Sequence, residues 1–185
     1  MVPQKNLPVL LHALAGLPGV RLRMIGDGPQ RSQLERLAAQ LQVSVEWIGQ
    51  VPNDAVARWL QKAQLFVFPS TYEGDPKAIL EAMACEVPVV ASDIPEHRAV
   101  MAHRQTGWLV PGRVDAVRTA IQTLLADATL RQMLARRAKE MVVAQRTLPH
   151  QFEAERQALL EVVSRDRVKR MEASGHLATS PRSFP

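Results

Sequence analysis

Residues 65–85 read LFVFPSTYEGDPKAILEAMAC, and this stretch decides the fold class. It opens with an apolar run, Leu65–Phe68, which is typical of a strand buried on both faces of a sheet. A polar loop follows from Pro69 to Asp75, and apolar residues then recur at helical spacing after Pro76. Proline is favoured in the first turn of a helix. The stretch therefore predicts a strand, a loop and a helix in that order.

Strand and helix patterns alternate on both sides of this stretch. Strands are predicted over 20–25, 44–48, 65–68, 87–91 and 108–110. Helices are predicted over 6–17, 31–42, 54–63, 76–85 and 95–102. Asn6 and Asn53 precede two of these helices and are predicted to be their N-caps. This alternation predicts an α/β fold with a Rossmann-like parallel sheet that has helices on both faces.

The sequence pattern divides the chain into three parts. Residues 1–147 carry the alternation and, from residue 114 on, two helices that each have an apolar face. The segment 148–170 contains a further predicted C-terminal helix, over 151–170. The last part, 171–185, is rich in Ser, Pro and Gly and is predicted to be disordered. One domain of ordinary size therefore accounts for most of the chain.

Charge and cysteine content narrow the function classes. Lys and Arg number 23 against 18 Asp and Glu, which suits a phosphate-bearing ligand or an anionic membrane surface. The basic residues are spread along the chain, without an RNA-stacking aromatic motif or a Cys/His zinc spacing, so nucleic acid is not expected as a partner. The single cysteine, Cys85, lies in an apolar run and is expected to be a small buried residue rather than a nucleophile.

The N-terminal region has some features of a signal peptide. Lys5 precedes an apolar run from Leu7 to Leu17, but His12 interrupts the run and a strand pattern follows it directly. No apolar stretch approaches the ~20 residues that span a bilayer. We therefore expect an amphipathic helix of a cytoplasmic protein. The basic run 165–170 is expected to be a solvated helix end, with peripheral contact at the inner membrane face as the minority interpretation.

The ligand site is expected beyond the carboxyl ends of the strands, as in other open α/β sheets. Three segments are expected there: 26–29, 50–52 and 70–78. In the third, the N–H groups and the dipole at the start of the helix can bind an anion such as a diphosphate. Glu73 lies in the loop and Glu81 lies about one turn into the helix, so both carboxylates can face one crevice and accept hydrogen bonds from sugar or ribose hydroxyls.

Several blocks of sequence resemble the signature of the glycogen-synthase-like, or group 1, retaining glycosyltransferases. The most specific blocks are Glu73-Gly74, Glu81–Cys85 and Pro88–Ser92. The resemblance extends over residues 3–147. It also includes Lys5-Asn6-Leu7, Gly26–Pro29, Gly49-x-Val51, Phe68–Ser70 and Thr106-Gly107-x-Leu109-Val110. It implies two Rossmann-like domains in the whole enzyme, of which this chain is similar to the second, the one that binds the nucleotide sugar.

The resemblance implies a role for each matching position. Glu73 matches the first Glu of the family's paired-Glu motif and would lie beside the transferred sugar as the catalytic residue, whereas Glu81 matches the second and would hold the ribose. Lys5 would neutralise the diphosphate, and Val51 would lie against the base. The backbone of Pro76–Ile79 would cradle the phosphates. The expected ligand-binding residues are Lys5, Gly26, Gly28, Val51, Gly74, Pro76, Lys77, Ala78, Ile79 and Glu81.

The implied reaction transfers a glycosyl group from a UDP-, GDP- or ADP-sugar to a glycan, a lipid or a small molecule, with retention at the anomeric carbon. Fixed positive charge on the leaving diphosphate lowers the barrier, and no covalent nucleophile is required. We expect no cofactor and no metal, because the family's lysine, arginine and helix dipole take the place of a divalent cation. The absence of an Asp-x-Asp motif agrees with this expectation.

Three features depart from the family pattern. The family's lysine follows an arginine by five residues, a position just before Met1, and the first strand and the acceptor-binding domain have no counterpart in this sequence. We therefore expect an acceptor-binding domain in trans or upstream, and no sugar transfer by this chain alone. Asp75 stands where an apolar residue is usual. Glu86 replaces the Gly that caps the helix in a left-handed conformation, so strain is expected at this turn.

Two other functions remain open from the sequence. One is a non-catalytic nucleotide-binding remnant or partner subunit of a split glycosyltransferase. The other is a sugar-nucleotide epimerase or phosphorylase of similar fold. The role of one side chain is also open: His97 is interpreted as a surface residue, with an approach to the acceptor side as the minority interpretation.

Overall fold

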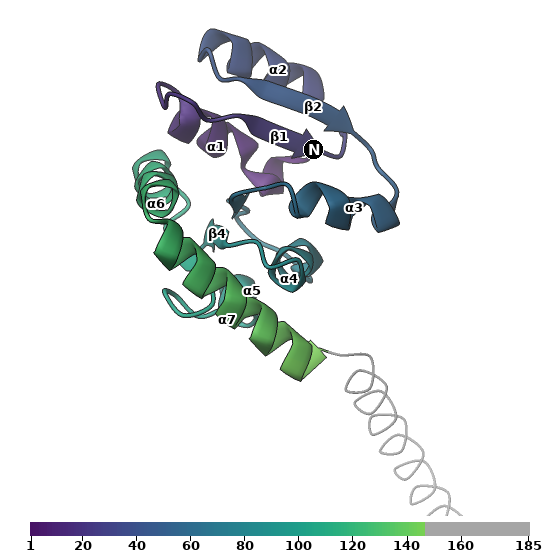
Figure 1. Ribbon diagram of the computed structural model, residues 1–185. Helices are drawn as coiled ribbons and strands as arrows, with labels where there is room; N and C mark the ends of the chain where they lie inside the picture. Colours follow the sequence, from purple (N-terminus) through teal and green to yellow (C-terminus); the bar gives the residue numbers. More distant parts are fainter. Residues whose placement is uncertain (147–185) are drawn as a thin grey trace, which may run out of the picture. The chain divides into compact units, whose positions relative to one another are not determined.

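A computed structural model describes residues 1–146 (Figure 1). The chain divides into one unit, Met1–Val143, and a second unit, Ala144–Pro185, of which only the end of the last helix is described. The C-terminal helix expected within 148–170 and the tail expected over 171–185 lie outside the described residues. None of the helices in the described part is long and apolar enough to cross a membrane.

Strands and helices alternate in the order that the sequence predicts. The strands are β1 Leu22–Ile25, β2 Val45–Gly49, β3 Phe66–Phe68, β4 Val89–Ser92 and β5 Trp108–Val110. The helices are α1 Leu7–Leu14, α2 Arg31–Gln40, α3 Asn53–Leu60, α4 Lys77–Ala84, α5 Pro95–Arg98, α6 Val114–Ala126 and α7 Ala128–Arg146, and a 3₁₀ turn, η1 Pro3–Lys5, precedes α1. The two helices predicted after residue 114 are confirmed as α6 and α7.

Neither predicted N-cap makes the expected side-chain bond. Asn6 does precede α1, but its backbone is left-handed, with φ 50°, and no side-chain cap bond forms. Its side-chain amide instead donates to the carbonyl of Gly112, at 3.4 Å. Asn53 is the first residue of α3, and Pro52 takes the cap position. A cap depends on the backbone angles at the helix entry, which the residue type alone does not determine.

All strand pairs are parallel, which confirms the α/β class, but the strands form two sheets instead of one. β1 pairs with β2, and β4 lies between β3 and β5. Every residue of β4 is buried, whereas β3 is only half-buried. The prediction that residues 65–68 form a strand buried on both faces is therefore wrong. Within residues 1–146, β3 has a strand neighbour on one edge only.

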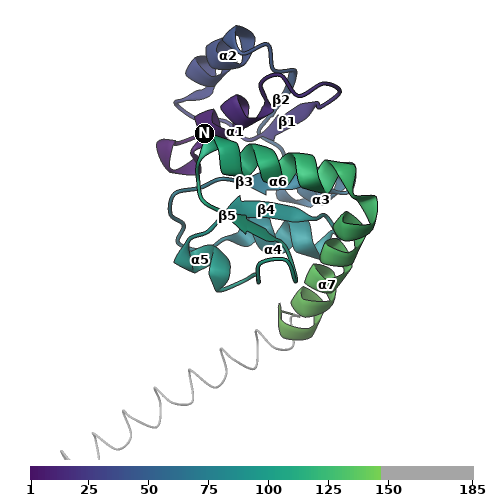
Figure 2. The ribbon, with the colours of Figure 1, turned by 90° about the vertical axis from the view of Figure 1, so that its left-hand side faces the viewer.

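Helices cover both faces of the three-stranded sheet, with α6 along one side and α4 along the other (Figure 2). Alternate residues of β4 point to opposite faces, as they must in a pleated strand. Val90 packs with α1 and α6, whereas Val89 and Ala91 pack with α4 and with the C-terminal half of α7. A separate cluster joins α1, α2 and the β1–β2 sheet through Leu11, Met24 and Leu34. Helix α1 therefore packs against both sheets, with Leu10 in one cluster and Leu11 in the other.

The turn after α4 has the left-handed conformation that the family resemblance predicts. Glu86 has φ 59°, which is a strained value for a residue with a side chain. Its carboxylate accepts a hydrogen bond from the Lys139 ammonium of α7, at 2.8 Å. That bond and the proximity of the charge lower the pKa of Glu86 from its usual value. The contact attaches the strained turn to α7.

Candidate functional site

An ion pair joins two of the predicted site residues, Lys5 near the N-terminus and Glu73 in the loop after β3. The ammonium of Lys5 donates to Oε1 of Glu73 at 2.6 Å, although the two residues are 68 positions apart. The Glu73 side chain is 6% exposed and that of Lys5 is 32% exposed, so the carboxylate is the buried partner. Nζ of Lys5 also lies over the Phe68 ring, 4.6 Å from its centroid, in a cation–π contact. The sequence places both residues at the site but does not predict that they bind each other.

Hydrogen bonds hold the N-terminal turn against the loop after β3. The Thr71 amide donates to the carbonyl of Gln4 at 2.8 Å, and the Tyr72 hydroxyl donates to the Gln4 side-chain oxygen at 2.9 Å. Gln4 immediately precedes Lys5, so these bonds carry the lysine to the end of the three-stranded sheet. This bridging role of Gln4 has no signal in the sequence, because it depends on which loop the N-terminal turn meets.

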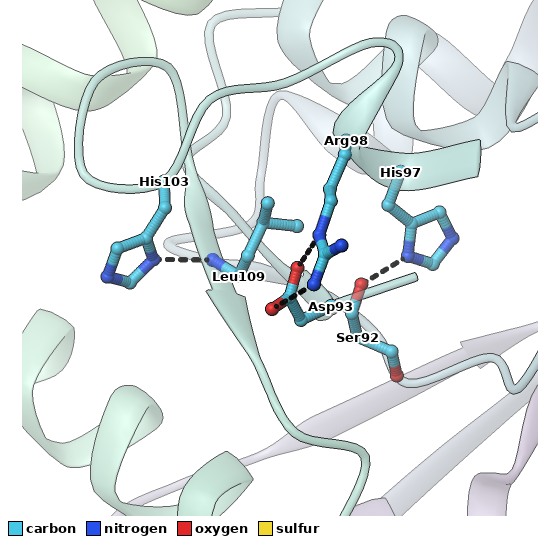
Figure 3. A network of polar contacts seen from close by, with 6 residues as sticks. All are labelled: Ser92, Asp93, His97, Arg98, His103 and Leu109. Carbon is cyan, nitrogen blue, oxygen red and sulfur yellow. Dashed lines mark hydrogen bonds and ion pairs between the residues drawn. The ribbon is translucent and has the colours of Figure 1, made fainter. Parts of the chain in front are cut away.

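His97 is fully buried, so its interpretation as a surface residue is wrong. Its Nδ1 lies 2.7 Å from the carbonyl oxygen of Ser92, as Figure 3 shows. Its ring lies 5.6 Å from that of Phe68, centroid to centroid. Burial lowers the pKa of His97, and the bond to Ser92 and the charge of Glu73 oppose that shift only in part. The sequence offers one signal of a role at the site, because His97 follows within a few residues of the carboxyl end of a buried strand.

An ion pair flanks His97 on the solvent side of the same segment. Arg98 donates two hydrogen bonds to the carboxylate of Asp93, from Nε at 2.5 Å and from Nη2 at 2.8 Å (Figure 3). This bond lowers the pKa of Asp93 from its usual value. The pair fixes the two ends of the turn that leads from β4 into α5. His97 is held by that turn, which limits how far its ring can move.

Buried polar atoms without hydrogen-bond partners gather at the carboxyl ends of β3 and β4. They are Oγ of Ser70, Oγ of Ser92 and Nε2 of His97, each unpaired within the described residues. Buried polar atoms are paired in most proteins, and an unpaired atom costs free energy. Three such atoms at one end of a sheet therefore indicate a site that a polar ligand completes. Ser70 lies in the predicted segment 70–78, whereas no sequence pattern points to Ser92.

The start of α4 offers one backbone amide that is free to bind a ligand. The amides of Lys77 and Ile79 donate to the carbonyls of Asp75 and Pro76, both at 2.9 Å. Pro76 has no N–H group. The Ala78 amide donates to no backbone carbonyl within residues 1–146 and is the first-turn donor open to an anion.

The three remaining predicted positions around α4 are exposed. Glu81 lies on α4, as predicted. A Cβ added at Gly74 would meet nothing within 4 Å, and the Gly74 backbone does not need a glycine. The side chain of Lys77 is also exposed. The room at Gly74, beside the α4 start, is compatible with a ligand approaching the backbone closely.

The remaining predicted residues form a second group at the end of the β1–β2 sheet. Gly26 has φ 101°, and its amide donates to the Gly49 carbonyl at 2.7 Å. Gly28 has no room for a side chain, because an added Cβ would collide with the backbone of Met1. Val51 follows β2 and is half-buried. Within the described residues no hydrogen bond joins this group to Lys5 and Glu73.

Comparisons with known proteins agree on one family. The family model described as "Glycosyl transferases group 1" matches residues 1–141. The lipopolysaccharide core biosynthesis glycosyltransferase LpsE of Rhizobium meliloti (strain 1021) is 35% identical over 147 residues, which cover 78% of this chain and 43% of that protein. The chain thus spans less than half the length of this relative.

Solved structures match the same fold. Sucrose-phosphate synthase from Thermosynechococcus elongatus is similar with a TM-score of 0.83 at 28% identity, over 88% of this chain and 43% of that chain. Anabaena Alr3699/HepE, solved in complex with UDP-glucose, is similar with a TM-score of 0.78 at 25% identity, over 85% of this chain and 46% of that chain. The chain therefore belongs to the group 1 glycosyl transferase family.

Proposed function

We propose that this chain is the donor-binding half of a retaining glycosyltransferase, which transfers a glycosyl group from a nucleoside-diphosphate sugar to an acceptor. One observation carries the proposal: the Lys5 ammonium is bonded to Glu73, which lies in the loop that leads from the carboxyl end of β3 to the start of α4. A cation and a helix N-terminus both attract the charge of a diphosphate. Family membership and the UDP-glucose complex of a similar protein support the choice of donor.

Each residue of the site receives a role in this proposal. Lys5 and the free Ala78 amide bind the diphosphate, and Lys77 adds an exposed positive charge beside it. Glu81, exposed on α4, accepts hydrogen bonds from the ribose hydroxyls. Glu73 faces the transferred sugar. Gly26, Gly28 and Val51, at the end of the other sheet, face the nucleoside.

The chemistry proposed for the site is electrostatic. Breaking the bond between the anomeric carbon and the phosphate oxygen leaves an oxocarbenium-like sugar and a charged diphosphate. Lys5 and the α4 dipole stabilise the diphosphate as its negative charge develops, which lowers the barrier to cleavage. In this proposal the carboxylate of Glu73, which is buried, stabilises the positive charge that develops on the sugar. The donor is a UDP-, GDP- or ADP-sugar, and no separate cofactor takes part.

The acceptor-binding surface is proposed to come from outside these residues, either in trans or from a longer polypeptide. The share of the relatives that this chain covers supports this assignment. Catalysis requires an acceptor hydroxyl held next to the anomeric carbon, and such positioning contributes roughly 7–11 kcal/mol to lowering a barrier. We therefore expect the isolated chain to bind a donor without turning it over.

Calorimetric titration with UDP, GDP and ADP tests the donor site. We expect weak binding of at least one diphosphate, and a loss of roughly tenfold or more in its affinity for Glu81→Ala, since a charge-assisted hydrogen bond contributes about 1.5–3 kcal/mol. Glu140→Ala is the matched control, because it removes an exposed carboxylate from α7, which carries none of the residues assigned to the donor site. Absence of any binding heat with all three diphosphates at millimolar concentration would contradict the proposed donor site.

A further inference from the structure

His97 carries a buried hydrogen-bond acceptor that the fold itself does not use. Its Nδ1 is 2.7 Å from the Ser92 carbonyl oxygen. A carbonyl oxygen can only accept, so the proton of the bond lies on Nδ1. In a neutral imidazole the other nitrogen, Nε2, is then an unprotonated acceptor. Nε2 points away from Ser92 (Figure 3), is buried, and has no partner within the described residues.

The surroundings of this acceptor are those of the proposed sugar site. The rings of His97 and Phe68 are in contact, and the Lys5 ammonium lies over the same Phe68 ring. Lys5 in turn holds the carboxylate of Glu73. One aromatic side chain therefore contacts both the imidazole and the ammonium of the Lys5–Glu73 ion pair.

The chemistry of a bare Nε2 selects one kind of partner. It requires a ligand that donates a proton into a hydrogen bond, which a sugar hydroxyl does. A diphosphate oxygen at neutral pH only accepts, so it would be repelled by the lone pair. A metal ion is not favoured, because no group of three or more His, Cys, Asp or Glu side chains within residues 1–146 is arranged to hold one.

We propose that His97 is a specificity-determining residue whose Nε2 accepts a hydrogen bond from a hydroxyl of the glycosyl group held beside Glu73. The inference rests on the proposed donor-binding function and adds to it a contact with the sugar that is separate from the contacts with the nucleotide. The bond between Nδ1 and Ser92 fixes the ring, and the Asp93–Arg98 pair fixes the turn that carries it. His97 thus presents its acceptor in one orientation and distinguishes sugars by the position of a hydroxyl.

The test separates sugar binding from nucleotide binding. In His97→Asn the side-chain amide can still donate to the Ser92 carbonyl, but the acceptor at the Nε2 position is lost. We expect unchanged affinity for free UDP, GDP or ADP. For the corresponding UDP-glucose, GDP-mannose or ADP-glucose we expect a loss of roughly 2- to 12-fold, the range for one neutral hydrogen bond. His97→Gln, which restores an acceptor near the Nε2 position, should recover part of that loss.

His103→Asn is the matched control, since His103 is an exposed histidine of the same region whose Nδ1 accepts from the Leu109 amide (Figure 3). It should leave both affinities unchanged. Equal effects of His97→Asn on a diphosphate and on its sugar conjugate, or no effect on the conjugate, would overturn the inference and leave the proposed function standing. Failure of the wild-type chain to bind any of the diphosphates or conjugates would overturn both.

A second measurement does not depend on how the variants fold. Long-range ¹H–¹⁵N correlation spectra of the wild-type chain report which imidazole nitrogen carries the proton. We expect His97 in the Nδ1–H form with an unprotonated Nε2, and a change in the Nε2 resonance when a sugar conjugate, but not the free diphosphate, is added. A protonated Nε2 at neutral pH would contradict the inference.

Discussion

Replacing Glu73 with Gln should tighten the binding of free UDP, or of whichever diphosphate binds the wild-type chain. The sequence alone predicts little effect of Glu73 on a free diphosphate, because Glu73 is expected to face the sugar. The structure changes that expectation, since the Lys5 ammonium is already bonded to Glu73 at 2.6 Å. A diphosphate must compete with this carboxylate for the lysine, and Gln is a weaker competitor.

The size of the effect follows from the contact. A hydrogen bond to a charged partner contributes about 1.5–3 kcal/mol, and one between less polar partners about 0.5–1.5 kcal/mol. The substitution therefore lowers the competition by about 1–1.5 kcal/mol, which corresponds to roughly a 5- to 12-fold gain in diphosphate affinity. Because the Lys5 side chain is 32% exposed, solvent screens the pair, and we expect a gain near the lower end of that range.

Isothermal titration of the wild-type chain and of Glu73→Gln with the same diphosphate measures this gain. Glu46→Gln is the matched control, because it removes the same charge from an exposed ion pair with Arg23 on the β1–β2 sheet. The control should not alter diphosphate affinity. Unchanged or weaker binding by Glu73→Gln, with its melting temperature preserved, would refute the competition between Glu73 and the diphosphate for Lys5.

Three further predictions follow from the fold. Glu86→Gly should raise the melting temperature by about 2–4 °C in a thermal scan because it relieves the left-handed strain at φ 59°, whereas Glu86→Gln, which loses only charge opposite Lys139, should not raise it. Leu134→Ala should cost about 2–5 kcal/mol in urea unfolding, since this α7 side chain is fully buried, and a cost below about 1 kcal/mol would contradict its place in the core. Burial lowers the pKa of His97 below its ordinary value, and the charge of Lys5 lowers it further, whereas the charges of Glu73 and Glu96 raise it. Because the net shift is downward, the unfolded state binds more protons than the folded state at mildly acidic pH. The stability that neutral His97 contributes is therefore present above its ordinary pKa and is lost as pH falls from about 7 to 5, so His97→Asn should lose less stability than wild type over that range in melting scans; parallel pH profiles would contradict it.

Much of the fold can be predicted from short stretches of sequence. The order of strands and helices, the parallel pairing and the helices on both faces follow from apolar periodicity and from turn residues, both of which act locally. The left-handed turn at Glu86 also follows, because the family pattern places a glycine at that position. Helix ends are predicted less well, as at Asn6 and Asn53, because a cap depends on the path of the preceding chain.

The candidate site divides in the same way. The strand–loop–helix pattern places Glu73 in a loop and Glu81 on a helix, because each depends on neighbours within a few residues. Whether Glu73 acts on a sugar and Glu81 on a ribose is still a prediction. The sequence does not reveal that the Ala78 amide is free while those of Lys77 and Ile79 are engaged, since that depends on the backbone angles of one turn.

Contacts between distant residues depend on tertiary packing. The Lys5–Glu73 ion pair joins residues 68 positions apart, and it forms because Gln4 is bonded to the loop after β3. His97 is buried because its short helix packs its ring against Phe68, although a Pro-Glu-His segment by itself is typical of a surface turn. Local patterns select which elements form, because backbone and side-chain preferences act over a few residues. Which side chains meet, and which polar atoms are buried without a partner, is decided only when those elements pack together.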